Sequence, residues 1–179
     1  MEEIVQSAGG IIYYLAEDGD PRYLLIKRHA LSGKIERVAP KGKIQEGETE
    51  KQAALREIWE ETSLSLDKLM VKQLLGTTSL RSNETKRGHL NKDVTYFLME
   101  YQGNPEDVRV IEGEGYIGVY KRATIQEVIN LIYYEDIREL IRSSYFALHN
   151  EKQQQVALQK QQEEEKKKEQ FRQALFAKV

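Results

Sequence analysis

The chain has 179 residues, 40% of them apolar, and a formal net charge of −2. This length favours one domain plus an appendage, and the apolar share is enough to form a hydrophobic core. The small net charge does not indicate a nucleic acid or an anionic membrane as a partner. The absence of cysteine excludes disulfides, thiolate zinc sites and cysteine nucleophiles. The first residues lack the features of a signal peptide and no apolar run could span a bilayer, so we expect a cytoplasmic protein.

The first part of the chain is predicted to form a β-hairpin followed by a short strand. Residues 5–15 read as a strand, residues 17–21 as a turn, and residues 23–28 as the second strand of the hairpin. Residues 37–39 predict a short strand that leads into the most informative segment, residues 40–64.

The segment 40–64 predicts a short helix with carboxylates on one face. Thr49 can cap this helix, with Gln52 as the return partner of a capping box. Glu57, Glu60 and Glu61 stand at i, i+3 and i+4, a spacing that places side chains on one helical face. The opposite side is predicted to pack on a core and carries Leu55, Ile58, Trp59 and Thr62.

The three glutamates predict a metal site. Like charges on neighbouring turns repel one another, so such a face is costly without a counter-charge. Mg²⁺ takes oxygen ligands and binds beside substrate phosphates, so the cluster indicates phosphate chemistry. The alternative is a solvated face of an amphipathic helix. Arg56 can anchor a neighbouring glutamate such as Glu48, and Gly42 lets the backbone turn and approach a ligand.

The second half of the chain adds strands and a second helix. Residues 71–79 and 94–101 predict two strands joined by a polar segment, and residues 116–120 predict the last strand. Thr124 and Glu127 predict a capping box at the start of a helix. Together these elements predict an α/β sandwich.

The tail over residues 149–179 predicts a charged helical extension. Residues 159–170 contain no apolar side chain, and Glu163 and Glu164 each precede a lysine by four residues, in the favourable order. The end regains an apolar stripe of Phe171, Leu175, Phe176 and Val179. This stripe can dock on the same domain, on a protein partner or on a second copy of the chain. A frayed polar extension is the alternative, and the polar middle disfavours a long coiled coil.

The spacing of charged residues in the segment 40–64 resembles the signature of the Nudix hydrolases. Gly42 is followed after five residues by Glu48, and after seven more by Arg56-Glu57-Ile58-Trp59-Glu60-Glu61. The family pattern continues with any residue, a glycine and an apolar residue. Here Ser63 replaces the glycine and Leu64 is the apolar residue. Glycine is favoured at this position because it caps a helix in the left-handed conformation. The position is not one of the candidate ligands, so the serine removes none of them.

The resemblance covers about residues 5–146 and implies a Nudix hydrolase domain over residues 1–148. Pro40-Lys41-Gly42 and the run 92–101 resemble the asymmetric dinucleoside tetraphosphatases. The implied fold is an α/β/α sandwich with a mixed sheet, and the implied cofactor is Mg²⁺ or Mn²⁺. The implied reaction cleaves a phosphoanhydride of a nucleoside polyphosphate, first of all diadenosine tetraphosphate to ATP and AMP.

The resemblance also implies roles for individual residues. Glu57 is the first candidate for the catalytic base, although the base varies across the family, and Glu48 is expected to brace Arg56. The implied metal ligands are Glu57, Glu60, Glu61, the backbone carbonyl of Lys41, and either Glu112 or Glu114. The last two glutamates can equally be exposed loop charges.

Basic and aromatic side chains are candidates for substrate binding. The basic residues that could grip a polyphosphate are Lys27, Arg28, Lys41, Arg81, Lys86, Arg87 and Lys92. Of these, Lys41 and Lys92 lie in family-like runs, and Gly42 allows a close approach of the backbone. Tyr96 and Tyr116 can stack on a base or pack in the core. His89 is a weaker candidate for a substrate contact.

Other functions stay open at this stage. They are a nucleoside triphosphate pyrophosphatase, a hydrolase of diphosphoinositol phosphates or RNA 5′ ends, and a non-catalytic nucleotide-sensing module. A larger basic surface is expected for the second of these. The intact glutamate cluster disfavours the third, because a pure binder has no need of such a costly face.

Overall fold

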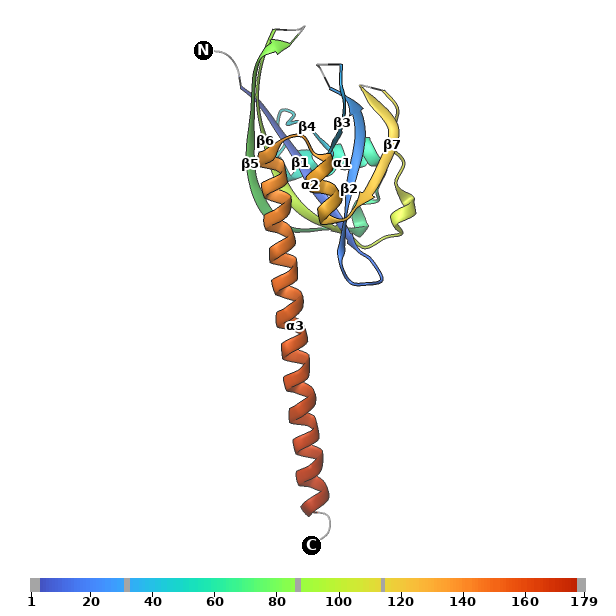
Figure 1. Ribbon diagram of the computed structural model, residues 1–179, viewed down its shortest axis with the longest axis vertical. Helices are drawn as coiled ribbons and strands as arrows, with labels where there is room; N and C mark the ends of the chain where they lie inside the picture. Colours follow the sequence, from blue (N-terminus) through green and yellow to red (C-terminus); the bar gives the residue numbers. More distant parts are fainter. Residues whose placement is uncertain (1–3, 31–32, 86–87, 114, 177–179) are drawn as a thin grey trace. The chain divides into compact units, whose positions relative to one another are not determined.

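The computed structural model describes residues 4–30, 33–85, 88–113 and 115–176. The chain divides into two compact units, Met1–Arg142 and Ser143–Val179. A seven-stranded mixed sheet forms the centre of the first unit (Figure 1). Its strands are β1 (Val5–Leu15), β2 (Pro21–His29), β3 (Ile35–Val38), β4 (Lys41–Lys43), β5 (Leu69–Thr85), β6 (Gly88–Tyr101) and β7 (Tyr116–Ala123).

Strand β1 organises the sheet. The order is β3-β2-β1-β6-β5, with β4 paired to β1 and β7 paired to β2. Strands β1 and β6 run parallel, whereas the other pairs are antiparallel. The first part of β1 pairs with β4, which places Ala8 opposite Gly42 and Gly9 opposite Lys41. The start of the predicted Nudix signature is therefore fixed against the centre of the sheet.

Helix α1 (Glu50–Thr62) begins and ends as the sequence predicts. Thr49 accepts a hydrogen bond from the backbone of Gln52, and the Gln52 side chain accepts one from the Thr49 amide. This reciprocal capping box satisfies two amides at the helix start. Ser63 closes the helix in the left-handed conformation, with φ 57°. The residue that departs from the family signature thus adopts the conformation for which glycine is favoured.

Helix α1 packs closely on β1 through small residues. Ala53, Ala54 and Ile58 are buried, and a Cβ built on Gly10 would lie 2.5 Å from the Cδ1 atom of Ile58. The prediction that Trp59 packs on the core is wrong, because its side chain is 56% exposed. Successive helical residues turn by about 100°, so the residue after the central contact Ile58 points out of this narrow interface.

The sheet is covered on both faces, as in an α/β/α sandwich. On β1, Ala8 and Ile12 belong to the core that includes α1, while the alternating residues Ile11 and Tyr13 are also buried. Because alternate side chains of a strand point to opposite faces, both faces of β1 are covered. On the second face lie α2 (Ile125–Leu131) and the first turns of α3 (Glu135–Phe176).

The segment between β5 and β6 differs from its prediction. The polar segment between residues 79 and 94 is expected to connect two shorter strands, but in its described residues the ladder continues as far as Thr85 and Gly88. Leu80 pairs with Lys92 and Arg81 pairs with Asn91. Cross-strand hydrogen bonds form between backbones whatever the polarity of the side chains, so a polar run can extend a hairpin. Two 3₁₀ turns, Leu66–Lys68 and Pro105–Asp107, complete the described elements of this unit.

The second unit consists of the remainder of α3. From residue 149 to residue 173 every side chain is exposed, including Val156, Leu158 and Phe171. The sequence predicts a boundary between a domain and an extension at residues 148 and 149, and helix α3 runs through these residues without interruption. This division of the chain stays a prediction. Of the predicted apolar stripe, Val179 lies outside the described residues. None of the described helices has the length and apolar character needed to cross a membrane.

Candidate active site

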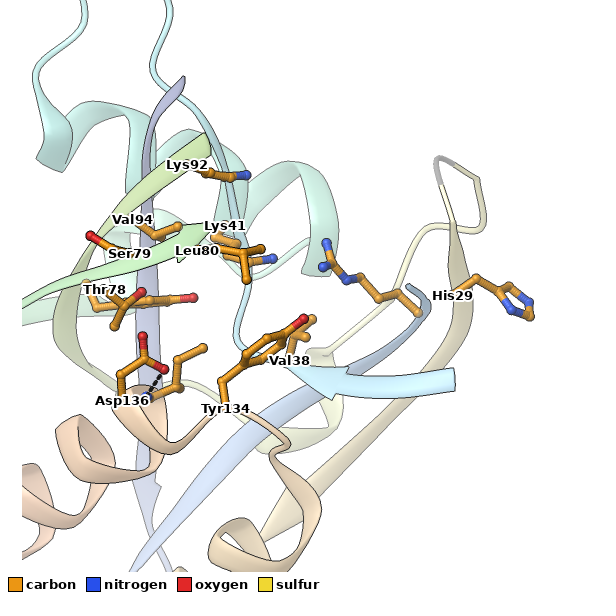
Figure 2. A pocket seen from close by; sticks show the side chains of 13 residues that line it. His29, Val38, Lys41, Thr78, Ser79, Leu80, Lys92, Val94, Tyr134 and Asp136 are labelled. Carbon is orange, nitrogen blue, oxygen red and sulfur yellow. Dashed lines mark hydrogen bonds between the residues drawn. The ribbon is translucent and has the colours of Figure 1, made fainter. Parts of the chain in front are cut away.

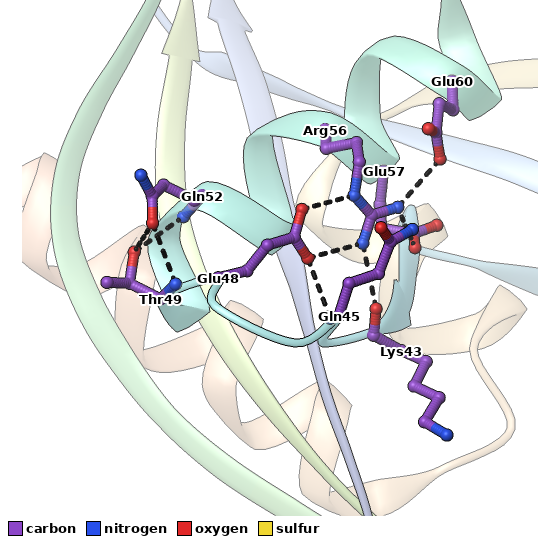
Figure 3. A network of polar contacts seen from close by, with 8 residues as sticks. All are labelled: Lys43, Gln45, Glu48, Thr49, Gln52, Arg56, Glu57 and Glu60. Carbon is purple, nitrogen blue, oxygen red and sulfur yellow. Dashed lines mark hydrogen bonds and ion pairs between the residues drawn. The ribbon is translucent and has the colours of Figure 1, made fainter.

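Arg56 is the counter-charge of the glutamate face on α1 (Figure 3). It donates a hydrogen bond to each carboxylate oxygen of Glu48, with N–O distances of 2.6 Å and 2.9 Å. It also donates to Glu57 at 2.6 Å and to Glu60 at 2.9 Å. A further bond reaches the backbone carbonyl of Lys43 at 2.9 Å. The predicted pair of Arg56 and Glu48 is therefore present, and the bond from Arg56 lowers the pKa of Glu48 to about 2.

Glu57 lies against the backbone of β4. A Cβ built on Gly42 would lie 2.0 Å from the Cδ atom of Glu57, so a side chain at residue 42 would displace this carboxylate. Glycine allows the carboxylate of Glu57 to occupy the space that a methyl group would fill. The structure thus gives a direct reason for the pairing of Gly42 with Glu57 in the signature.

Glu61 is held at both of its carboxylate oxygens. Its Oε2 atom accepts a hydrogen bond from the Lys41 amide at 3.0 Å, and its Oε1 atom accepts one from the Tyr116 hydroxyl. The side chain is only 8% exposed. Burial raises the pKa of Glu61, while the bonds from Tyr116 and Lys41 oppose this rise. A buried carboxylate with two fixed bonds has a defined orientation.

The glutamates of α1 share an open cleft of about 410 Å³ with the segment before β7. Its lining residues are Glu57, Glu60, Glu61, Ile111, Glu112, Gly113 and Tyr116. Of the two further carboxylates suggested by the sequence, Glu112 lies in this cleft and Glu114 falls outside the described residues. The donors available in the cleft are oxygens, which hard divalent cations prefer.

These carboxylates fit a divalent cation by their chemistry, but two of them are engaged by Arg56. Among the side chains that the structure describes, no group of three acidic or other metal-binding residues has a ready ligating arrangement. Arg56 binds Glu57 and Glu60 at one oxygen each. A cation in this cleft would compete with Arg56 for these oxygens, so its binding requires the two side chains to turn.

A second cavity, of about 220 Å³, lies beside β6 and carries several positive charges (Figure 2). Arg28, Lys41 and Lys92 line it together with Tyr96. Tyr134, just before α3, and Asp136, in its first turn, line the opposite side in Figure 2. Four of the predicted substrate-binding residues are therefore brought together here, although they come from three different strands.

Two polar atoms at this cavity are buried without a hydrogen-bond partner in the described structure. They are the Nζ atom of Lys41 and the hydroxyl of Tyr96. Burial, together with the charges of Arg28 and Lys92, lowers the pKa of Lys41. An unpaired buried cation is unfavourable, and an anionic ligand would relieve it. Because the Lys41 amide binds Glu61, this residue joins the cationic cavity to the carboxylate cleft.

The remaining sequence candidates are distributed differently. Tyr116 lies in the carboxylate cleft, where its hydroxyl binds Glu61. Arg81 pairs with Asp93 at 2.6 Å. Lys86 and Arg87 lie outside the described residues, and the side chain of His89 is likewise not described. Sequence reasoning did not select Glu36, which binds Arg28 at 2.7 Å, because nothing in its spacing links β3 to this cavity.

The fold and the glutamate signature define a class of protein. The family model of the NUDIX domain matches residues 6–144. The chain belongs to the Nudix family, and this membership, with its similarity to an Ap4A hydrolase of known structure, supports a pyrophosphohydrolase. Nudix hydrolases generally use divalent metal ions. No curated protein matches the chain significantly.

Solved structures agree with this assignment. The Ap4A hydrolase of C. elegans, in a binary complex, is 27% identical with a TM-score of 0.64, covering 80% of this chain and 98% of that chain. The E. coli dihydroneopterin triphosphate pyrophosphohydrolase is 18% identical with a TM-score of 0.61, covering 81% and 99%. The MutT protein of Methanosarcina mazei Go1 is 18% identical with a TM-score of 0.57, covering 85% and 98%. The last two similarities concern the fold alone.

Proposed function

We propose that the protein is a Mg²⁺-dependent hydrolase of dinucleoside polyphosphates, which cleaves diadenosine tetraphosphate to ATP and AMP. The observation that carries this proposal is the junction at Lys41. Its amide holds Glu61 of the carboxylate cleft, while its ammonium group lies buried in the cationic cavity. A polyphosphate is long and highly charged, so it can engage both places at once.

The cationic cavity is proposed to bind phosphate oxygens. Arg28, Lys41 and Lys92 carry positive charge there, and the Lys41 ammonium has three donors and no partner. A phosphate oxygen would supply that partner and favour the charged form of Lys41. The hydroxyl of Tyr96 offers one further donor of the same kind.

The carboxylate cleft is proposed to be the reaction centre. Glu60 and Glu61 would hold the cation, with the Lys41 carbonyl and Glu112 as further donors, and Glu57 would either join them or act as the base. When bound, the cation neutralises phosphate charge and makes water a better nucleophile. Water attacks phosphorus as the bond to the bridging oxygen breaks, and a glutamate takes the proton of the water. Glu57 is the first candidate for this base because Gly42 leaves room for its carboxylate.

Similarity to the C. elegans Ap4A hydrolase supports the choice of a dinucleoside tetraphosphate. Its sequence identity of 27% is higher than the 18% of the other two structures described above. The two more distant structures share the fold, but their similarity does not support any choice of substrate. We therefore place the dinucleoside polyphosphate before a nucleoside triphosphate, and the other substrate classes become outcomes of the test.

Neutral replacements of the glutamates test this assignment. We expect Glu60→Gln and Glu61→Gln each to reduce turnover by more than about 100-fold, because a ligand amide binds a hard cation poorly. Circular dichroism should show that both variants are folded. Glu163→Gln, on the exposed part of α3, is the matched control and should keep full activity. Full activity of either active-site variant at saturating Mg²⁺ would contradict the metal assignment.

A further inference from the structure

The hydroxyl of Tyr116 lies between the carboxylate cleft and the cationic cavity. It donates a hydrogen bond to Glu61, and it also interacts with the side chain of Arg28. Tyr116 is the first residue of β7, and its backbone is paired with that of Arg28 on β2. A backbone bond from His29 to Gly115, at 2.7 Å, fixes the same strand end. The position of the phenol is therefore set by the sheet.

Arg28 is itself fixed from its other side. Its Nε and Nη2 atoms both lie 2.7 Å from the Oε1 atom of Glu36 on β3. A phenol has one proton to donate and lone pairs that accept. Because the Tyr116 proton goes to Glu61, the Tyr116 oxygen can only accept from the cationic side chain of Arg28 beside it. Neighbouring bonds in such a chain polarise and strengthen one another.

Glu61 depends on this contact for its orientation. The Lys41 amide fixes one carboxylate oxygen, and Tyr116 fixes the other. With Glu61 only 8% exposed, water has little access to replace a lost bond. Removing the hydroxyl would leave a buried carboxylate oxygen unsatisfied, which is unfavourable. The carboxylate would then turn towards whatever donor remains.

We propose that Tyr116 is a positioning residue, which orients Glu61 for the cation and ties that orientation to Arg28 in the cationic cavity. This inference rests on the proposed function, in which Glu61 is a metal ligand and the cavity binds phosphate. It differs from both roles suggested by the sequence, in which Tyr116 stacks on a base or packs in the core.

The test compares Tyr116→Phe with Tyr120→Phe on the same strand. Tyr120 donates to Glu106 at 3.4 Å and is not among the residues that line the carboxylate cleft. The first readout is the affinity of the protein for Mn²⁺ in the absence of nucleotide, measured by electron paramagnetic resonance. Loss of a residue that orients a metal ligand typically weakens binding by about 10–100-fold. We expect this loss for Tyr116→Phe and wild-type affinity for Tyr120→Phe.

The second readout separates positioning from substrate contact. At saturating metal, Tyr116→Phe should lower kcat and leave KM for the nucleotide close to the wild-type value. A raised KM with unchanged kcat and unchanged Mn²⁺ affinity would overturn the inference and make Tyr116 a substrate contact. Wild-type Mn²⁺ affinity in Tyr116→Phe would also overturn it.

Arg28→Lys tests the same chain should Tyr116→Phe fail to fold. Lysine keeps the charge but loses the fork that reaches both Glu36 and Tyr116. We expect weaker Mn²⁺ binding in this variant, and unchanged binding would overturn the link to Arg28. The metal titrations need no turnover. If the wild type binds Mn²⁺ without cleaving dinucleoside polyphosphates, the proposed function fails while the positioning role is still tested. Absence of Mn²⁺ binding by the wild type would contradict both.

Discussion

The carboxylate of Glu57 occupies the position that a side chain on Gly42 would need. The closest approach, from a Cβ on Gly42 to the Cδ atom of Glu57, would be 2.0 Å. Two residues fifteen positions apart in the sequence are thus in direct contact across α1 and β4. In this chain the glycine therefore leaves the space that the glutamate carboxylate fills.

Gly42→Ala should therefore displace Glu57 without unfolding the protein. A misplacement of about 1 Å near a reaction centre can reduce the rate by about 100-fold, and we expect a loss of kcat of that order. The measurement is the steady-state rate at saturating Mg²⁺, with thermal unfolding as the control for folding. Full activity of Gly42→Ala would show that Glu57 can move without consequence, which contradicts its role as ligand or base.

Glu48→Gln should change the acid stability of the protein. Arg56 holds the pKa of Glu48 at about 2 in the folded state, below its ordinary value of 4.5. The charged carboxylate then stabilises the fold above pH 4.5, and this contribution is lost as the pH falls from 4.5 towards 2. Wild type and Glu48→Gln should differ in free energy of unfolding at pH 7 and converge near pH 2. Urea unfolding at several pH values measures this, with Glu46→Gln as the control.

Ser63→Gly should stabilise the protein. Ser63 has φ 57°, a conformation that disfavours residues with a Cβ by roughly 1–2 kcal/mol. The greater flexibility of unfolded glycine offsets part of this, so we expect a net gain of about 0.5–1 kcal/mol. Chemical denaturation measures the gain, and kcat should not change. Ser65→Gly, at φ −69°, is the control and should give no gain. Equal effects of the two variants would contradict the conformational explanation.

Lys41→Met should separate stability from substrate binding. The Lys41 ammonium is buried without a partner, so an apolar replacement should leave the free energy of unfolding unchanged or raise it. The same change removes a proposed phosphate contact, and KM for the polyphosphate should rise by about tenfold or more. Denaturation and steady-state kinetics test the two halves. A destabilised variant with normal KM would contradict the assignment of Lys41 to the substrate.

Local features of this protein are predictable from sequence, and relations between strands are less so. The capping box at Thr49, the pair of Arg56 with Glu48 and the left-handed cap at Ser63 all depend on neighbours within one segment. The exposure of Trp59 depends instead on how closely α1 approaches Gly10. No spacing rule reports that distance.

The second half of the candidate site shows the same limit. Arg28, Glu36 and Tyr116 come from three strands, and they meet because of the pairing register of β2 with β3 and β7. The sequence identified Arg28 and Tyr116 only as a basic and an aromatic residue near the resembling segments. The pairing of Arg28 with Tyr116 is set by strand register, and the bond from Tyr116 to Glu61 by the packing of α1 on the sheet.

Product analysis with diadenosine tetraphosphate and Mg²⁺ tests the central claim most directly. The nucleotides are separated by chromatography, beside parallel reactions with nucleoside triphosphates, ADP-ribose and a diphosphoinositol phosphate. We expect equal amounts of ATP and AMP, formed much faster than any product of the other substrates. Two molecules of ADP would contradict the proposed position of cleavage. Faster release of pyrophosphate from a triphosphate, or no turnover despite metal binding, would contradict the proposed substrate.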